Sequence, residues 1–121
     1  MAESIICERA FEFAARILNL CQRLWDRGPI ARHIASQLMK CGSSIGSNAE
    51  EAQEGQTKPD YVAKLSVSRK ESRETRYWLR LAVRMNIATL EEVKWEMDEV
   101  NQLRAMIIRA IKTAQASSSR G

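Results

Sequence analysis

Residues that break helices are scarce in this chain. It has two prolines and five glycines among 121 residues, which is few for an all-β fold because such folds need these residues at their many turns. Apolar residues make up 45% of the chain and charged residues 28%, which is ordinary for a globular protein. A chain of this length is expected to form one domain. The composition therefore favours a single helical domain.

Long apolar segments are also missing. No run approaches the ~18 consecutive apolar residues that a helix needs to cross a membrane. Glu8 and Arg9 lie where the apolar part of a signal peptide would be, and no basic segment precedes them. We therefore expect a soluble, cytoplasmic protein with no membrane partner.

Residues that bind metals are few. The three cysteines, Cys7, Cys21 and Cys41, are odd in number and show no CxxC spacing, which argues against a disulfide framework or a zinc site. We expect them to be small buried apolar residues in a reducing compartment. A di-iron bundle needs Glu-x-x-His pairs, but the only histidine, His33, has Ile30 three residues before it. We therefore expect no metal and no cofactor, and we place His33 on the surface.

Apolar residues recur at helical spacing in four segments of the chain. We expect these segments to be helices at about 5–26, 30–53, 59–84 and 89–115. In the first segment the apolar residues step by four and three, the heptad pattern of packed helices. Its members are Ile6, Ala10, Phe13, Ile17, Leu20 and Leu24. Similar seams in the later segments begin at Ile30, Tyr61 and Leu90.

Turn and capping residues separate the four segments. Gly28 and Pro29 stop the first helix, and Asn86 suits the end of the third. Thr57 and Thr89 are each placed to cap the helix that follows, with an acidic residue three positions later. Long helices joined by short loops predict an antiparallel up-down-up-down four-helix bundle over residues 1–116. We expect residues 117–121 to form a disordered tail.

The middle of the second segment is rich in small residues, from Gly42 to Asn48. Small residues let two helix backbones approach closely. A glycine-rich phosphate loop is the alternative, but the order Gly-Ser-Ser-Ile-Gly-Ser matches neither a P-loop nor a dinucleotide fingerprint, and no strand precedes it. We therefore expect close helix packing here.

Basic residues are concentrated in the third segment. Between Pro59 and Met85 there are seven basic and three acidic residues, a net charge of +4 that equals that of the whole chain. Five arginines are spaced by four, three, four and four residues, which places them on one face of a helix. They are Arg69, Arg73, Arg76, Arg80 and Arg84. Because like charges in a row repel one another, we expect this face to have a partner.

Three interpretations of the arginine face stay open. With Lys70, it can bind phosphates of RNA or DNA. Because no base-reading motif is present, such binding would depend on charge and shape rather than on sequence. It can instead pair with carboxylates of another subunit, for which arginine is well suited. The candidate partners are Glu50, Glu51, Glu54, Glu91, Glu92, Glu96 and Glu99. The third interpretation is a solvated face.

A layer of polar residues is expected inside the bundle. If the second and third helices pack antiparallel, positions whose numbers add up to about 112 face each other, which places Ser44 opposite Ser68. The members of the layer would be Ser44, Ser47, Asn48, Ser68, Glu71 and Ser72. Such a layer must be fully hydrogen-bonded. A serine nucleophile would also need a base, and His33 lies about three turns away, so we expect no catalytic residue and no enzyme.

Large apolar side chains exceed what one four-helix core can bury. Several lie on second stripes beside the predicted seams, and exposed apolar patches of that size mark interfaces. The candidates are Phe11, Leu18, Trp25, Trp78 and Trp95. We therefore expect a homo-oligomer rather than a cofactor pocket.

Several motifs of the second and third segments resemble those of a known family. They are Ser44-Ile45-Gly46-Ser47-Asn48-Ala49-Glu50, Glu54-Gly55, Asp60-Tyr61-Val62-Ala63-Lys64-Leu65, Lys70-Glu71 and Glu74-Thr75 with Trp78-Leu79. The chain resembles the four helix bundle protein family, which includes proteins encoded within intervening sequences of bacterial 23S rRNA genes. It is also similar to the accessory variability determinant of diversity-generating retroelements, which shares the fold. Gly46 stands where many relatives carry proline.

The resemblance implies a homopentamer of four-helix bundles, and most family members have no assigned activity. For the retroelement relatives it also implies a basic surface that engages nucleic acid and a reverse transcriptase. We therefore expect a non-enzymatic, basic oligomeric scaffold that binds RNA or DNA, with a reverse transcriptase or another protein as a further candidate partner. The alternative is a protein-interaction adaptor whose arginine face is used in subunit contacts.

Overall fold

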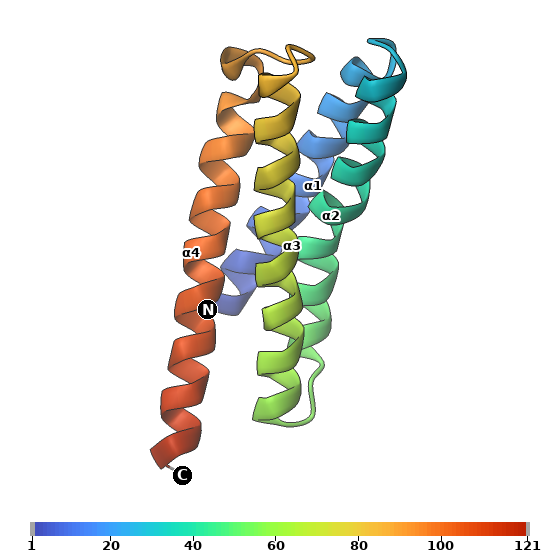
Figure 1. Ribbon diagram of the computed structural model, residues 1–121. Helices are drawn as coiled ribbons and strands as arrows, with labels where there is room; N and C mark the ends of the chain where they lie inside the picture. Colours follow the sequence, from blue (N-terminus) through green and yellow to red (C-terminus); the bar gives the residue numbers. More distant parts are fainter. Residues whose placement is uncertain (1, 121) are drawn as a thin grey trace.

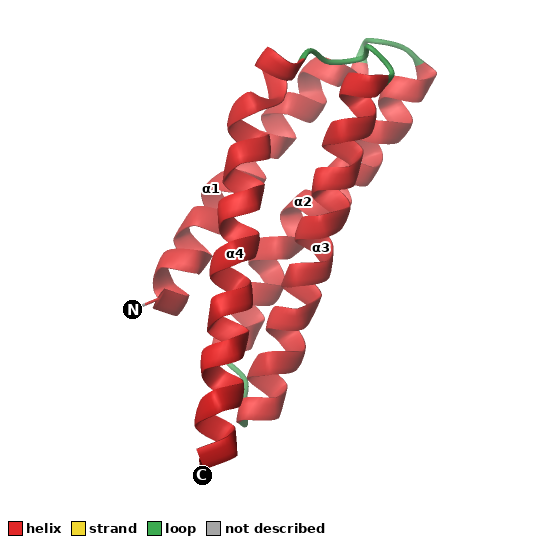
Figure 2. Ribbon diagram, turned by 60° about the vertical axis from the view of Figure 1, so that its left-hand side comes forward, coloured by secondary structure: helices red, strands yellow, loops and turns green. Residues whose placement is uncertain are grey.

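The computed structural model describes residues 2–120, and the side chains of residues 5–117. It contains the helices α1 (Ala2–Trp25), α2 (Pro29–Gln53), α3 (Lys58–Arg84) and α4 (Leu90–Arg120) (Figure 1). No strand occurs within residues 2–120, so the prediction of an all-α chain with four helices is confirmed. Each helix packs against two others, in the cyclic order α1, α2, α3, α4. The loops lie at the two ends of the helices (Figure 2).

The predicted turn and capping residues end the helices in the structure. Gly28 has a φ of 112°, and Asn86 has a φ of 59°, the region that glycine and asparagine adopt most easily. Thr57 Oγ1 accepts a hydrogen bond of 3.2 Å from the backbone N–H of Asp60. Thr89 Oγ1 accepts one of 3.0 Å from the N–H of Glu92. Both predicted threonine caps are therefore confirmed.

The last helix is longer than its sequence pattern indicated. α4 runs to Arg120, past the predicted end at 115, so residues 117–120 belong to a helix rather than to the predicted disordered tail. Gln115 and Ala116 have high helix propensity and allow the helix to continue beyond its last packed turns. Met1 and Gly121, at the limits of the predicted domain and tail, lie outside the described residues.

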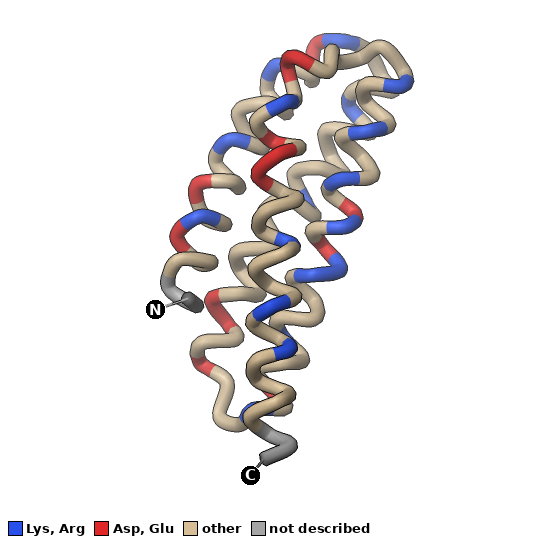
Figure 3. Tube along the Cα trace, turned by 90° about the vertical axis from the view of Figure 1, so that its left-hand side faces the viewer, with Lys and Arg blue, Asp and Glu red and all other residues tan. Residues whose placement is uncertain are grey.

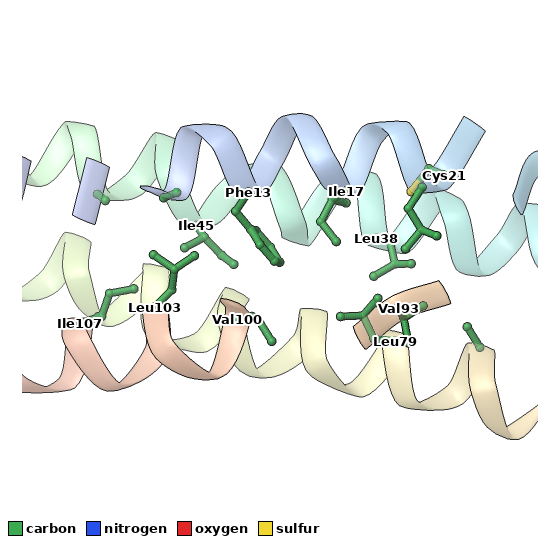
Figure 4. Close-up of a cluster of buried hydrophobic side chains, with 14 of the residues drawn as sticks. Phe13, Ile17, Cys21, Leu38, Ile45, Leu79, Val93, Val100, Leu103 and Ile107 are labelled. Atoms are coloured by element: carbon green, nitrogen blue, oxygen red, sulfur yellow. The ribbon is translucent and has the colours of Figure 1, made fainter. Parts of the chain in front are cut away.

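The core runs along the centre of the four helices. Phe13, Ile17, Leu38, Ile45 and Leu103 are fully buried and point toward a common interior (Figure 4). The predicted seam of α1 is buried along its whole length, from Ile6 to Leu24.

Two residues at the predicted starts of seams are exposed instead. Ile30 is 56% exposed and Leu90 is 72% exposed. Each lies in the first turn of its helix, but the nearby residues Ala31 and Ala88 are buried. Ile30 and Leu90 are therefore exposed because they lie on the outer sides of their helices, not because the core begins later.

The small residues of α2 allow it to approach α1 closely. A Cβ atom added to Gly42 would lie 2.8 Å from Cγ2 of Ile17. A Cβ atom added to Gly46 would lie 3.3 Å from the carbonyl carbon of Ala10. The prediction of close helix packing in this segment is confirmed, because atoms of α1 lie within 3.3 Å of the Cβ position at both glycines.

The cysteines are distributed through the helical core. Cys21 and Cys41 are buried and Cys7 is half-buried. The Cys21 thiol donates to the backbone carbonyl of Ala35 at a sulfur–oxygen distance of 3.4 Å. Burial raises the pKa of the Cys21 thiol to about 12 and also raises the pKa of Cys41.

Within residues 2–120, no helix has a stretch long and apolar enough to cross a membrane.

Charged and aromatic side chains join α1 to α4. Arg9 Nη2 lies 2.7 Å from Glu99 Oε1, and Arg27 Nη1 lies 2.7 Å from Glu92 Oε1. Between these ion pairs, the Arg16 guanidinium carbon lies 4.1 Å from the ring centroid of Trp95. Arg9, Arg27, Glu92 and Glu99 are therefore already paired within one chain.

Candidate nucleic-acid interface

The predicted basic residues form a continuous exposed row on α3. We call Arg69, Arg73, Arg76, Arg80 and Arg84 the arginine row; all five side chains are exposed, as is Lys70. Their spacing is possible because α3 is helical without a break from Lys58 to Arg84, and side chains three and four residues apart lie side by side on such a helix. Figure 3 shows basic segments recurring along α3, next to α4.

None of the row's guanidinium groups has an acidic partner among the side chains of residues 5–117. Among the side chains of residues 5–117, the ion pairs join Arg9 to Glu99, Arg23 and Arg27 to Glu92, and Lys64 to Glu51. The arginine row takes part in none of them. Its charge is therefore available to a molecule outside the chain.

Several carboxylates proposed as subunit partners are occupied or covered. Glu99 is bound by Arg9 of α1 and Glu92 by Arg27 of the loop after α1, and hydrogen bonding from Arg27 lowers the pKa of Glu92. Glu96 is only 3% exposed. The exposed members of the set that make no ion pair in the described region are Glu50, Glu54 and Glu91. Pairing between subunits would depend mainly on these three.

The basic surface extends from the arginine row of α3 to Arg104 of α4. Arg69, Lys70, Arg73 and Ser66 of α3 line a recess of about 280 Å³ together with Arg104. The Nε atom of Arg104 is buried and has no hydrogen-bond partner among the described residues. A buried donor without a partner is costly, and an anion in this recess would supply an acceptor. Four cations converging from two helices make a site suited to phosphate.

Sequence reasoning missed Arg104, although a signal for it exists. If α3 and α4 run antiparallel about a loop centred near Ile87, residues whose numbers add up to about 174 lie side by side, which would pair Arg104 with Lys70. The spacing of arginines within α3 does not reveal this contribution from α4.

A second recess lies farther along the row. Its volume is about 390 Å³, and it is lined by Arg73, Glu74, Arg76, Tyr77 and Arg80. Glu74 is the only acid in this lining. Its neighbour Glu71 has a raised pKa, caused first by burial and then by the charge of Glu74. The second recess therefore combines three arginines with one exposed aromatic ring.

The predicted polar layer is only partly present. Ser68 and Ser72 are buried, but Ser47 is exposed and Ser44, Asn48 and Glu71 are half-buried. Ser68 Oγ donates a hydrogen bond of 2.8 Å to the carbonyl of Ile45 on α2, close to the predicted facing position. The prediction of a buried polar layer that includes Ser47 is therefore wrong.

The hydroxyl groups of this region are satisfied mainly inside their own helices. Ser44 Oγ donates to the carbonyl of Lys40 at 2.7 Å, and Ser72 Oγ donates to that of Arg69 at 2.6 Å. Serine in a helix can bond one turn back in this way, so these side chains need no partner across the bundle. Sequence spacing alone does not reveal this local alternative.

The five predicted interface residues fall into two groups. Phe11, Leu18 and Trp25 are 70%, 42% and 42% exposed, so their position leaves them open to another molecule. Trp78 and Trp95 are half-buried and pack against the core, and Trp95 stacks on Phe13 with ring centroids 6.2 Å apart. These two tryptophans are therefore largely used within the chain, because their long side chains reach back over it.

Comparison with known proteins identifies relatives across most of the chain. A family model described as 23S rRNA-intervening sequence protein matches residues 2–109. A solved structure from Bacteroides thetaiotaomicron VPI-5482, described as a protein of unknown function from the S23 ribosomal protein family, has a TM-score of 0.86 and 31% identity. The match covers 93% of this chain and 99% of that one. No curated protein matches.

Proposed function

The chain belongs to the 23S rRNA-intervening sequence protein family, and from that membership and the geometry of α3 we propose that it is a non-enzymatic scaffold that binds the phosphate backbone of RNA or DNA. The single observation that carries the proposal is the exposed arginine row, which has no acidic partner among the described side chains. Arg104 adds a cation from α4.

The proposed mechanism is neutralisation of several phosphates at once. At a rise of about 1.5 Å per residue, the row from Arg69 to Arg84 is about 22 Å long. This length corresponds to about six or seven stacked nucleotides at about 3.4 Å each. Each phosphate contact releases bound counterions, so affinity for the row would fall steeply as salt is added. Guanidinium groups can each bind a phosphate through two hydrogen bonds.

Assembly would multiply this surface. We propose an antiparallel up-down-up-down bundle that forms a homopentamer in the cytoplasm through the exposed side chains Phe11, Leu18 and Trp25 of α1. These residues are seven positions apart, the repeat of a helix packing along a seam. Five copies of the arginine row would then act on one nucleic acid.

The test is binding of the purified protein to a fluorescent structured RNA and to a DNA duplex across a salt series. The variant Arg73→Gln/Arg76→Gln removes two charges from the row. We expect it to weaken binding and to reduce the slope of log affinity against log salt by about 1.4 to 1.8, the value for two lost phosphate contacts. The control Lys94→Gln/Lys112→Gln removes two exposed charges from α4 and should leave the slope unchanged.

Two results would contradict the proposal. No binding at low salt would exclude a phosphate-binding role for the row. If Arg73→Gln/Arg76→Gln changes the mass of the assembly in sedimentation while nucleic-acid binding is absent, the arginines act in subunit contacts, as in the adaptor alternative.

A further inference from the structure

Tyr77 is an exposed aromatic side chain inside the second recess of the arginine row. The side chain is 54% exposed, and the recess around it is formed by Arg73, Arg76 and Arg80. It follows Arg76 directly, so it lies about 100° around α3 from that arginine. The ring is therefore at the outer edge of the row, with guanidinium groups along one side.

The tyrosine ring is braced by other rings rather than loose. Its centroid lies 5.3 Å from that of Trp78, with an angle of 86° between the ring planes. Trp78 in turn packs against the core and lies 5.6 Å from the ring of His33 on α2, at 80°. These edge-to-face contacts fix the orientation of Tyr77 before any ligand arrives. A ring held in advance loses little conformational freedom on binding.

We propose that Tyr77 is a stacking platform for an unpaired base, so that the preferred ligand of the arginine row is single-stranded nucleic acid. This inference rests on the proposed function, because the arginines must hold the backbone that carries the base. Sites for single strands combine a basic track with aromatic rings on which bases stack. In a duplex each base already stacks on its neighbours and is paired, so its face is not available to Tyr77.

Replacing an aromatic ring on which one base stacks lowers the affinity for the strand by about five-fold to about 150-fold. Because every base has a flat face, the preference should depend little on sequence. The arginines on the same side of the ring would hold the adjacent phosphates. Tyr77 therefore turns a general phosphate-binding surface into one that distinguishes unpaired from paired strands.

The experiment measures affinity for three ligands of equal length, each with a fluorescent label. They are an oligothymidine strand, an abasic strand with the same phosphates, and a DNA duplex. We expect the oligothymidine strand to bind more tightly than the abasic strand by about five-fold or more. Tyr77→Leu should remove this difference while leaving affinity for the abasic strand unchanged, and Tyr77→Phe should preserve it.

Leu90→Ala is the control, because it shortens another exposed apolar side chain, 72% exposed, on α4, outside both the arginine row and the apolar stripe of α1. It should leave the base-dependent difference intact. Equal affinity of the unaltered protein for the base-bearing and abasic strands would overturn the stacking proposal while the phosphate-binding function still holds. A loss caused by Tyr77→Leu that is equal for all three ligands and accompanied by a change in assembly mass would instead make Tyr77 a contact between copies. No binding to any of the ligands would reject the proposed function itself.

Discussion

Gly42 is the residue on which the approach of α1 and α2 depends most directly. Its missing side chain leaves space that Cγ2 of Ile17 already occupies, at 2.8 Å from where a Cβ would lie. Ile17 is branched at Cβ and fully buried, so it cannot turn away easily. The cost of adding one methyl group here is set by the helix–helix distance rather than by helix propensity.

We expect Gly42→Ala to destabilise the protein. Alanine is favoured over glycine in a helix by about 1 kcal/mol, but overpacking costs about 1–3 kcal/mol. The net loss in the free energy of unfolding should be up to about 2 kcal/mol, measured by urea denaturation followed by circular dichroism.

A double-mutant cycle with Ile17→Ala provides the control for this prediction. Ile17→Ala alone should cost about 2–5 kcal/mol. In that background Gly42→Ala should be neutral or stabilising, because its methyl group enters the space that Ile17 has left. The same penalty in both backgrounds would show that Ile17 is not the obstacle.

Arg104 shows a limit of reasoning from single residues. Its charge is visible in the sequence, but its ability to bind an anion together with other cations depends on which helix lies beside it. That its Nε has no hydrogen-bond partner among the described residues becomes evident only when α3 and α4 are placed together.

At the scale of elements, α1 and α4 are tied together near the end of the bundle by Glu92. Arg27 holds this carboxylate through two bonds, from Nη1 at 2.7 Å and from Nη2 at 2.9 Å, and Arg23 Nε lies 3.4 Å away. Arg27 Nη1 also donates to the carbonyl of Ile87 at 2.9 Å. Glu92 of α4 is thus linked to α1 through Arg23 and to the loop after α1 through Arg27, which also contacts the loop before α4.

We expect Glu92→Gln to lower stability at neutral pH but not in strong acid. Hydrogen bonding from Arg27 lowers the pKa of Glu92 below its ordinary value of 4.5. Such a group stabilises the folded state above its unfolded pKa and loses that effect as the pH falls through its folded pKa. The loss at neutral pH should be about 1 kcal/mol, the upper end for partly exposed ion pairs, measured from urea midpoints at both pH values.

Glu51→Gln is the comparison for this variant. Glu51 lies 3.6 Å from Lys64, and both side chains are largely exposed, at 61% and 46%. Its removal should have little effect at either pH. If Glu92→Gln were as mild as Glu51→Gln at neutral pH, the tie would contribute no measurable stability.

The sequence predicts the helices better than it predicts their outward sides. The seams from Ile6 to Leu24 and the caps at Thr57 and Thr89 depend on residues close together in the chain, and both are found. The polar layer was predicted less well because Ser44 and Ser72 bond to their own helices. The burial of Trp95 depends on contacts with α1, which helical spacing alone does not specify.

For the whole molecule, the proposed homo-oligomer depends on the apolar stripe of α1. Phe11 and Leu18 are exposed and lie two helical turns apart on one face. We expect the unaltered protein to sediment as an assembly heavier than a monomer, and Phe11→Glu/Leu18→Glu to sediment as a monomer with unchanged helix content. The helices should persist because neither side chain belongs to the core.

Val67→Glu tests whether this effect is specific to α1. Val67 is 38% exposed on α3, so the same kind of change on another helix should leave the assembly intact. A protein that is monomeric over a wide concentration range before any substitution would contradict the oligomer.

The buried cysteines, Cys21 and Cys41, allow thiol labelling to report on opening of the folded molecule. Only the thiolate reacts with alkylating reagents, and the Cys21 thiol, with a pKa of about 12, supplies almost none of it while the helices stay packed. We therefore expect covalent labelling of Cys21 and Cys41 to require opening of the bundle and to slow when opening becomes less frequent. The native chain thus carries its own reporter of conformational opening, in the presence or absence of a nucleic acid.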